Sequence, residues 1–143
     1  MFGTIERKLD DKNRVILPPV FRDSLGSTFF ITVGFDGNAE LRSEDNFNKY
    51  VAEIESKSMF DKNARILRRS ILGRATQIQL DSQGRFLVPK NIIDLTSIQK
   101  NVVFVGVGSF VEFWAKEAYD SQSELNDGDL IANIAQKLSG INN

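Results

Sequence analysis

The chain has 143 residues, of which 41% are hydrophobic, and its 18 basic and 19 acidic side chains give a formal net charge of −1. It contains no cysteine and no histidine, which excludes disulfides, zinc sites built on those residues, and catalysis by Cys–His or Ser–His pairs. No phosphate-binding glycine loop and no apolar run of about 20 residues occurs. We therefore expect no catalytic residue, metal, cofactor, small-molecule substrate or membrane span. The N-terminal residues lack the pattern of a signal peptide, so we expect a cytoplasmic protein.

The first half of the chain predicts four strands followed by helices. Strands are expected over residues 4–9 and 15–17, and over 29–33 and 39–42, which flank the turn sequence FDGN. The unbroken aliphatic run at 15–17 indicates a buried strand, which Pro18 ends. Helices are expected from an N-cap at Ser43 to about residue 57, and from about 61 to 72.

The second half predicts a matching set of strands and then a helical end. Strands are expected over residues 76–80, 86–88, 102–107 and 111–114. We expect Trp114 to anchor the end of the last hairpin in the core, with an oligomer contact as the alternative. One helix begins after it at Lys116. Another covers about 129–138, and its apolar stripe fits packing against a neighbour.

Two segments of the chain repeat one another. Residues 9–18 read LDDKNRVILP and residues 80–89 read LDSQGRFLVP, so that Leu, Asp, Arg and Pro recur at the same spacing. The match continues into the later strands of each half with a shift of one residue. Two related half-domains therefore make up most of the chain.

The polar pentads DDKNR and DSQGR predict two copies of one tight, solvent-facing turn. Asn13 and Gly84 occupy the same place in the repeat, and these are the residue types that most readily adopt a positive φ. Asp10 and Asp81 stand at the head of the turns, where a carboxylate accepts hydrogen bonds from backbone N–H groups. We expect these four residues to form a structural turn motif.

Two copies of D-x-x-x-R about seventy residues apart, each followed by an apolar triplet and a proline, resemble the MraZ family. The resemblance spans almost the whole chain. It implies an α+β fold in which two AbrB-like swapped-hairpin modules form a double-split β-barrel core with linking and C-terminal helices. The first module is expected at residues 5–47, a helical linker at 48–75, the second module at 76–119 and a C-terminal helical tail at 120–143.

The same resemblance implies a DNA-binding transcriptional regulator. MraZ-like proteins assemble into ring-shaped homo-oligomers and bind short G-rich direct repeats in double-stranded DNA, upstream of their own division and cell-wall operon. A nucleoid-associated location would follow. The chain departs from the family pattern at Asn13, where glycine is usual, and at Pro19, where a small residue is usual. Asn13 is expected to preserve the turn.

Arg14 and Arg85 are the candidate DNA-reading residues, because arginine suits bidentate recognition of guanine in the major groove. Lys12 and Lys8, with Arg7 close by, are candidates for phosphate contacts that set the register. Gln83 takes the place of Lys12 in the second copy, so the two modules need not contribute equally to DNA recognition. An alternative is that each Asp–Arg pair only braces its turn through a salt bridge.

The charge distribution leaves other functions open. Residues 60–90 carry seven basic and two acidic side chains, and residues 115–143 carry two basic and five acidic ones. The cluster Arg65, Arg68, Arg69 and Arg74 is a rival DNA surface, or a solvated helix, or an intersubunit face for the acidic tail. A self-assembling scaffold associated with cell division, with little DNA affinity, is the second hypothesis. A Mg²⁺-dependent enzyme using Asp10, Asp11 and Asp81 is the third, and an Arg competing for each repeat carboxylate argues against it.

Overall fold

The computed structural model describes residues 1–140. Its strands are β1 (Phe2–Lys8), β2 (Arg14–Ile16), β3 (Thr28–Val33), β4 (Ala39–Ser43), β5 (Thr76–Gln79), β6 (Arg85–Leu87), β7 (Asn101–Val107) and β8 (Val111–Ala115). Its helices are α1 (Pro19–Leu25), α2 (Glu44–Glu55), α3 (Lys62–Ile71), α4 (Lys90–Thr96), α5 (Lys116–Asp120) and α6 (Gly128–Gly140), with a short 3₁₀ helix, η1 (Ser123–Asn126). The fold is mixed α+β, as the family resemblance implied.

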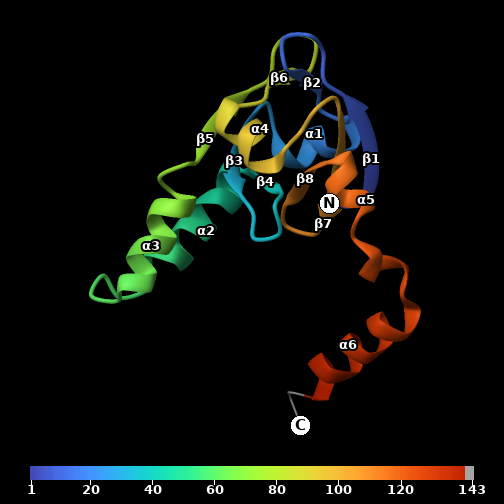
Figure 1. The fold of residues 1–143 in the computed structure, drawn as a ribbon. Helices are drawn as coiled ribbons and strands as arrows, with labels where there is room; N and C mark the ends of the chain where they lie inside the picture. The colour runs from blue at the N-terminus through green and yellow to red at the C-terminus, as the bar shows by residue number, and fades with distance from the viewer. Residues whose placement is uncertain (141–143) are drawn as a thin grey trace.

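The two halves of the chain exchange their first strands. Strand β1 pairs with β7 of the second half, and β5 pairs with β3 of the first half, both antiparallel. The hairpins β3–β4 and β7–β8 meet through β4 and β8, which gives one sheet in the order β1-β7-β8-β4-β3-β5. Strands β2 and β6 form a separate two-stranded ribbon at the tip of the molecule (Figure 1).

The described strands do not form the closed barrel that the double-split arrangement implies. Within residues 1–140, β1 and β5 are the two outer strands of the large sheet and do not pair with each other. The exchange of strands, the β4–β8 pairing and the β2–β6 ribbon join the halves. Because every large-sheet contact of β1 and β5 is with the other half, neither half can complete its sheet alone.

The core lies between the ribbon, α1 and α4 on one side and the inner face of the large sheet on the other. Phe86 from the ribbon is 2% exposed and contacts three buried phenylalanines. Its ring centroid lies 5.4 Å from that of Phe29, 6.0 Å from Phe113 and 6.4 Å from Phe104. The ribbon is therefore fixed to the body by its own inward-facing side chains.

The expected strands and the four expected helices are confirmed, with ends that move by at most two residues. Two short helices, α1 and α4, were not predicted. Each has seven residues and follows a proline, Pro18 or Pro89. A segment of that length is too short to display a repeating apolar stripe, although a proline at the start of a helix is favourable.

Trp114 is buried as expected, at 4% exposure, but outside the main core. It lies on the opposite face of the large sheet from Phe113, with its ring centroid 5.8 Å from that of Tyr119 on α5. Side chains of neighbouring strand residues point to opposite faces, which places residue 114 away from the central phenylalanines.

Candidate nucleic-acid interface

Each polar pentad forms a tight loop that is closed by the carboxylate at its head. Asp10 Oδ1 accepts hydrogen bonds from the backbone N–H groups of Lys12, at 2.9 Å, and Arg14, at 2.8 Å. Asp81 Oδ1 accepts the same two bonds from residues 83 and 85, both at 2.9 Å. The two loops therefore share one hydrogen-bond pattern.

The residues with positive φ connect the two loops to one another. Asn13 has a φ of 61° and Gly84 a φ of 75°. In this conformation the carbonyl of Asn13 accepts a hydrogen bond from Val88 N–H at 2.9 Å, and the carbonyl of Gly84 accepts one from Leu17 N–H at 3.0 Å. Each turn is thus held by the opposite half of the chain, so the two loops are positioned as a unit.

The β2–β6 ribbon presents a symmetrical outer face. Val15 and Phe86 pair across the ribbon and point into the core, at 1% and 2% exposure. Their neighbours point outward, because side chains alternate along a strand. The outer face therefore carries, in cross-strand pairs, Arg14 opposite Leu87 and Ile16 opposite Arg85.

The two arginines are held by the carboxylates of their own loops. Arg14 Nε donates to Asp10 Oδ2 at 2.8 Å, and Arg85 Nε donates to Asp81 Oδ2 at 2.8 Å. Within the described residues, the terminal Nη1 and Nη2 atoms of both arginines make no hydrogen bond, so their paired donors stay available. Each carboxylate therefore fixes the direction of a guanidinium and leaves its outer edge free for a ligand.

The same contacts keep both carboxyl groups ionised. The backbone N–H of Arg14 has the largest effect and, with the Arg14 side chain, holds the pKa of Asp10 below its ordinary 3.8 against a smaller opposing effect of burial. The backbone and side chain of Arg85 lower the pKa of Asp81 in the same way. Each loop is a neutral ion pair at physiological pH rather than an isolated positive charge.

Ile16 and Leu87 correct a sequence-based expectation. The unbroken aliphatic triplets predicted strands buried on both faces, but Ile16 is 45% exposed and Leu87 is 61% exposed. The ribbon has only two strands and packs one face on the core, so every second side chain meets solvent. An exposed aliphatic side chain beside an arginine suits contact with a thymine methyl group, and only the register of the ribbon reveals it.

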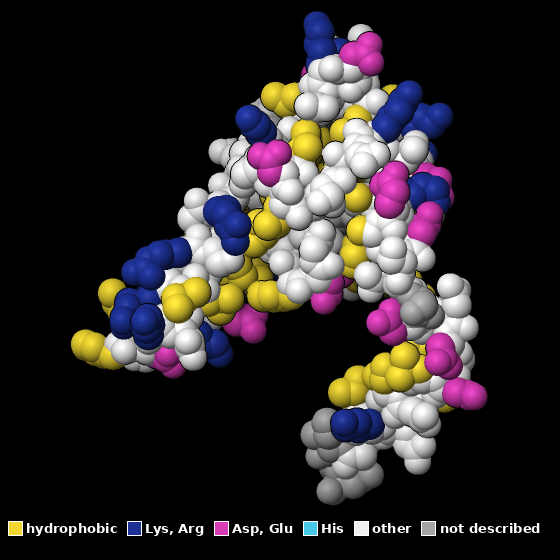
Figure 2. All heavy atoms as spheres, in the orientation of Figure 1, with side chains coloured by type: hydrophobic (Ala, Val, Ile, Leu, Met, Phe, Trp, Pro, Cys, Tyr) yellow, Lys and Arg dark blue, Asp and Glu magenta, His cyan; other side chains and the backbone are white. Residues whose placement is uncertain are grey.

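The remaining basic candidates lie around the first loop. Lys12 is exposed within it, and Lys8 is exposed at the end of β1. Arg7 is half-buried and donates from Nη1 to the carbonyl of Glu6. Figure 2 shows basic side chains at the tip of the molecule with acidic ones beside them.

Sequence reasoning missed Lys100, which the fold brings to this region. Its carbonyl accepts a hydrogen bond from Leu9 N–H at 2.8 Å, and the residue after it, Asn101, pairs with Lys8 in the sheet. Lys100 is exposed. No sequence signal could have placed it here, because it lies about ninety residues from the loop it adjoins.

Arg22 was missed as well. It belongs to α1 of the first half, and its Nε donates to the carbonyl of Leu17 at 2.9 Å. Its guanidinium covers Gly84 of the second loop, because a Cβ at residue 84 would lie 2.6 Å from Arg22 Cζ. The first half thus supplies a positive charge to the second loop, in which Gln83 takes the place of Lys12.

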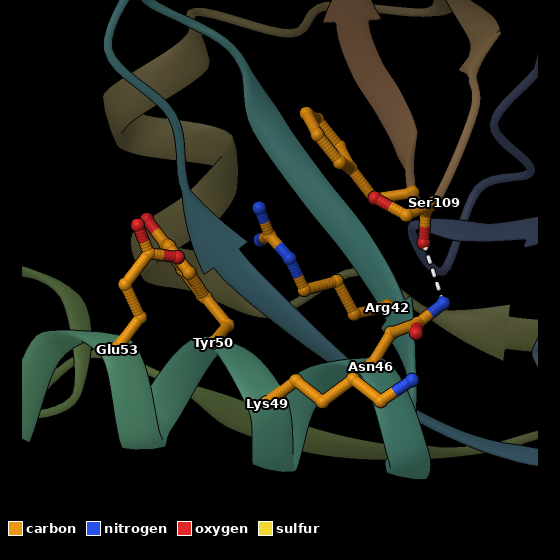
Figure 3. A pocket seen from close by; sticks show the side chains of 7 residues that line it. Arg42, Asn46, Lys49, Tyr50, Glu53 and Ser109 are labelled. Atoms are coloured by element: carbon orange, nitrogen blue, oxygen red, sulfur yellow. Dashed lines mark hydrogen bonds between the residues drawn. The ribbon is translucent and has the colours of Figure 1, made fainter.

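A second site is a cavity of about 390 Å³ between α2 and the β7–β8 turn. Figure 3 shows the Arg42 side chain reaching from β4 into it. The Arg42 guanidinium carbon lies 3.7 Å from the centroid of the Tyr50 ring and 4.3 Å from that of Phe110. Its Nη1 lies 2.8 Å from Glu40 Oε1, and both side chains are less than 10% exposed.

These contacts indicate a structural ion pair rather than a binding site. Burial raises the pKa of Glu40, and the positive charge of Arg42 opposes that effect. The guanidinium is occupied by Glu40 and by the two aromatic rings, whose faces attract a cation. Burial also raises the pKa of Tyr50, whose hydroxyl has no hydrogen-bond partner among the described residues.

The arginine cluster of α3 is engaged in holding its own connection to α2. Arg68 Nη2 donates to the carbonyls of Glu55, at 3.0 Å, and Lys57, at 2.7 Å, where α2 ends. Arg65 Nη1 donates to the carbonyl of Met59 at 2.9 Å. Two of these arginines therefore stabilise a helix end and a loop.

The structure also bears on metal and membrane sites. Over residues 1–140, no group of three or more acidic side chains is placed to hold a metal ion. In the same residues, no helix combines the length and the apolar character needed to cross a bilayer.

Comparison with known proteins gives a consistent result. A family model for MraZ proteins, described as antitoxin-like, matches residues 1–70 and again residues 71–138. A protein of Mycoplasmopsis pulmonis (strain UAB CTIP) named transcriptional regulator MraZ is 43% identical over 138 residues, which cover 96% of this chain and 94% of that protein. Proteins of the same name in Ureaplasma parvum serovar 3 (strain ATCC 700970) and Mesomycoplasma hyopneumoniae (strain 7448) are 38% and 34% identical, over 95% and 96% of this chain and 94% and 95% of theirs.

Proposed function

The chain belongs to the MraZ family of transcriptional regulators, and we propose that it acts by inserting the β2–β6 ribbon into the major groove of DNA. Its sites are short direct repeats upstream of its own division and cell-wall operon, and it binds them as a ring-shaped homo-oligomer. It works in the cytoplasm, associated with the nucleoid. Two modules, residues 5–47 and 76–119, form the reading unit, with a helical linker at 48–75 and a helical tail at 120–143.

The observation that carries this proposal is the outer face of the ribbon. A major groove about 12 Å wide admits a two-stranded ribbon. Arg14 and Arg85 project from it with Nε held by an aspartate and the two Nη atoms free. That arrangement suits bidentate donation to O6 and N7 of guanine, worth about 1–3 kcal/mol of discrimination for each good pair.

Phosphate contacts come from the basic residues that surround the ribbon. Lys12 lies in the first loop, with Lys8 and Arg7 beside it at the end of β1. Lys100 adjoins them, and Arg22 covers the second loop. Such contacts set the register and add affinity that depends on salt. Because Asp10 and Asp81 cancel the charge of the reading arginines, these residues carry most of the attraction for the DNA backbone.

Oligomerisation complements this reading unit. One ribbon contacts only a few base pairs, so a single copy binds weakly. Several copies related by a head-to-tail symmetry present the same ribbon at regular intervals, which matches direct repeats.

The test is an anisotropy titration of labelled DNA from upstream of the gene, at several salt concentrations, beside a scrambled duplex. Arg14→Ala and Arg85→Ala are compared with Lys49→Ala, which removes one positive charge from an exposed position on α2. We expect wild type and Lys49→Ala to prefer the genuine sequence and to lose affinity steeply with salt. Both ribbon variants should lose about fivefold to a hundredfold in affinity for that sequence.

The outcome also separates the regulator from the scaffold. Equal, weak binding to both duplexes, with no difference between the arginine variants and wild type, would contradict DNA reading by the ribbon. The self-assembling scaffold associated with cell division would then become the leading hypothesis.

A further inference from the structure

The C-terminal helix α6 exposes an apolar stripe. Every residue of α6 except Leu130 is exposed, and none is buried. Ile131, Ile134 and Leu138 are 45%, 44% and 61% exposed, and their spacing places them along one face. A helix of this length is marginal in water without packing. The stripe therefore needs a surface to cover it.

A cavity of about 270 Å³ lies at the root of this tail, on the outer face of the large sheet. Its lining includes both apolar and acidic side chains. The apolar part includes Val105, Trp114 and Leu125, and the acidic part includes Asp36, Glu112 and Glu124. We refer to this cavity together with α6 as the tail notch.

On the other side of the molecule from α6, an arm is formed by α2, α3 and the loop between them (Figure 1). At its tip, Met59 is 68% exposed and Phe60 is 96% exposed. The tip is held in place, because Arg65 and Arg68 donate hydrogen bonds to the loop carbonyls. An exposed aromatic ring on a braced loop is a typical anchor of a protein interface.

The two surfaces are complementary in charge as well as in apolar character. The loop, α3 and the residues directly after it, 56–74, carry six basic and one acidic side chain, whereas α2 carries one basic and four acidic ones. The tail residues 115–140 carry two basic and five acidic ones, so the complementarity concerns the α3 side of the arm. Figure 2 shows Lys and Arg side chains gathered on the arm, and hydrophobic side chains along the face of α6 that is turned toward the arm side of the molecule. Complementary potentials favour association and fix its orientation.

We propose that the arm of one copy docks in the tail notch of a second copy, with Phe60 in the cavity and α3 alongside the α6 stripe. The occupant is another copy because both matching surfaces belong to this chain and lie on opposite sides of it (Figure 1). Such a contact is heterologous and head-to-tail, so it closes into a ring or continues as a filament. This inference rests on the proposed function in one respect, since it supplies the assembly that direct repeats require.

The experiment is a charge exchange between the two surfaces. The arm variant carries Lys62→Glu and Arg69→Glu, two exposed residues of α3. The tail variant carries Glu124→Lys, which lines the cavity, and Asp129→Lys, which lies in the first turn of α6. Molar mass in solution is measured by light scattering for wild type, for each variant alone and for an equimolar mixture of the variants.

We expect the molar mass of wild type to exceed the 16.1 kDa of one chain. Each variant alone should have the mass of one chain, because side chains of like charge would meet at every contact between copies. The mixture should regain the mass of wild type, because the acidic arm of one variant now fits the basic tail of the other. Restoration on mixing also shows that both variants are folded. A monomeric wild type, variants that assemble unaided, or a mixture that stays monomeric would each overturn the proposal.

Phe60→Ser tests the anchor by itself, and Val20→Ser is its matched control, because Val20 is an exposed aliphatic residue on α1 at 59% exposure. We expect Phe60→Ser to weaken self-association about tenfold or more and Val20→Ser to leave it unchanged. Equal effects of the two would contradict the docking of Phe60.

Binding of each charge variant to a duplex with a single repeat is measured separately. Failure of DNA binding with normal assembly would remove the proposed function alone. Normal DNA binding by variants whose mixture does not regain the molar mass of wild type would contradict this interface alone.

Discussion

The guanidinium of Arg22 covers the backbone of Gly84, so that a Cβ at residue 84 would lie 2.6 Å from Arg22 Cζ. The two residues belong to different halves of the chain. In the sequence repeat, the counterpart of Gly84 is Asn13, and the counterpart of Arg22 is Ile93. The two loops share their backbone geometry but differ in what covers them, which explains how asparagine fits one copy while the other has glycine.

This difference predicts unequal responses to substitution. Gly84→Ala adds a side chain at a φ of 75° and displaces Arg22 from its hydrogen bond with Leu17. We expect it to lower the free energy of unfolding by about 1–3 kcal/mol. Asn13→Gly, which relieves the same backbone strain at an exposed position, should be neutral within about 1 kcal/mol. Denaturant unfolding of both variants measures this, and equal losses would contradict it.

A second prediction concerns the aspartates that hold the reading arginines. Asp10→Asn keeps a side chain of the same shape but removes the charge that fixes Arg14 Nε. The loop also gains net positive charge. We expect stronger binding to a scrambled duplex and weaker preference for the genuine repeat, measured by anisotropy with both DNAs. Improved preference would show that Asp10 is not a positioning residue.

The same ion pairs predict a pH dependence. The pKa values of Asp10 and Asp81 are lowered, so the stability that they contribute is present above the ordinary value of 3.8 and is lost as the pH falls through the folded pKa below it. Carboxyl NMR titration should give both values under 3.8. In Arg14→Ala the pKa of Asp10 should rise only part of the way, because the backbone N–H of residue 14 remains. Values at or above 3.8 in the wild-type protein would contradict this account.

Ile16 and Leu87 give a prediction about specificity. Both side chains are exposed on the ribbon, so Ile16→Ser and Leu87→Ser should leave the free energy of unfolding nearly unchanged. We expect them to weaken binding most at repeats that place a thymine methyl against the ribbon. Titration against duplexes with uracil in place of thymine measures this, since wild type should then bind as the variants do. An equal loss on both duplexes would argue against methyl contact.

The buried pair of Glu40 and Arg42 gives a prediction about stability. Arg42→Met leaves the Glu40 carboxylate buried without its partner, and we expect a loss of about 3–5 kcal/mol at neutral pH. The double variant Glu40→Gln, Arg42→Met should lose less. Burial already raises the pKa of Glu40, so its folded pKa exceeds its unfolded pKa, and stability falls as the pH rises through that interval. The defect of Arg42→Met should therefore shrink in mild acid, where Glu40 takes up a proton.

Local sequence signals determined the strands, the longer helices and the two turns. Alternating apolar residues mark the strands, and Ser43 marks the start of α2 through its hydroxyl, which accepts a hydrogen bond from Asn46 N–H. The repeat of D-x-x-x-R located both loops. Each of these features depends on residues close together in the chain, which is why the sequence alone contains them.

Only the tertiary structure decided which residues share a surface. The exchange of β1 and β5 between the halves, the outward direction of Ile16 and Leu87, and the places of Lys100 and Arg22 all depend on pairings between distant segments. The sequence of a strand does not determine which strand it pairs with. An apolar triplet is also the same sequence whether one or both faces of its strand are buried. Local sequence therefore determines the turns and strands, whereas the candidate site forms only where strand pairing brings the two halves together.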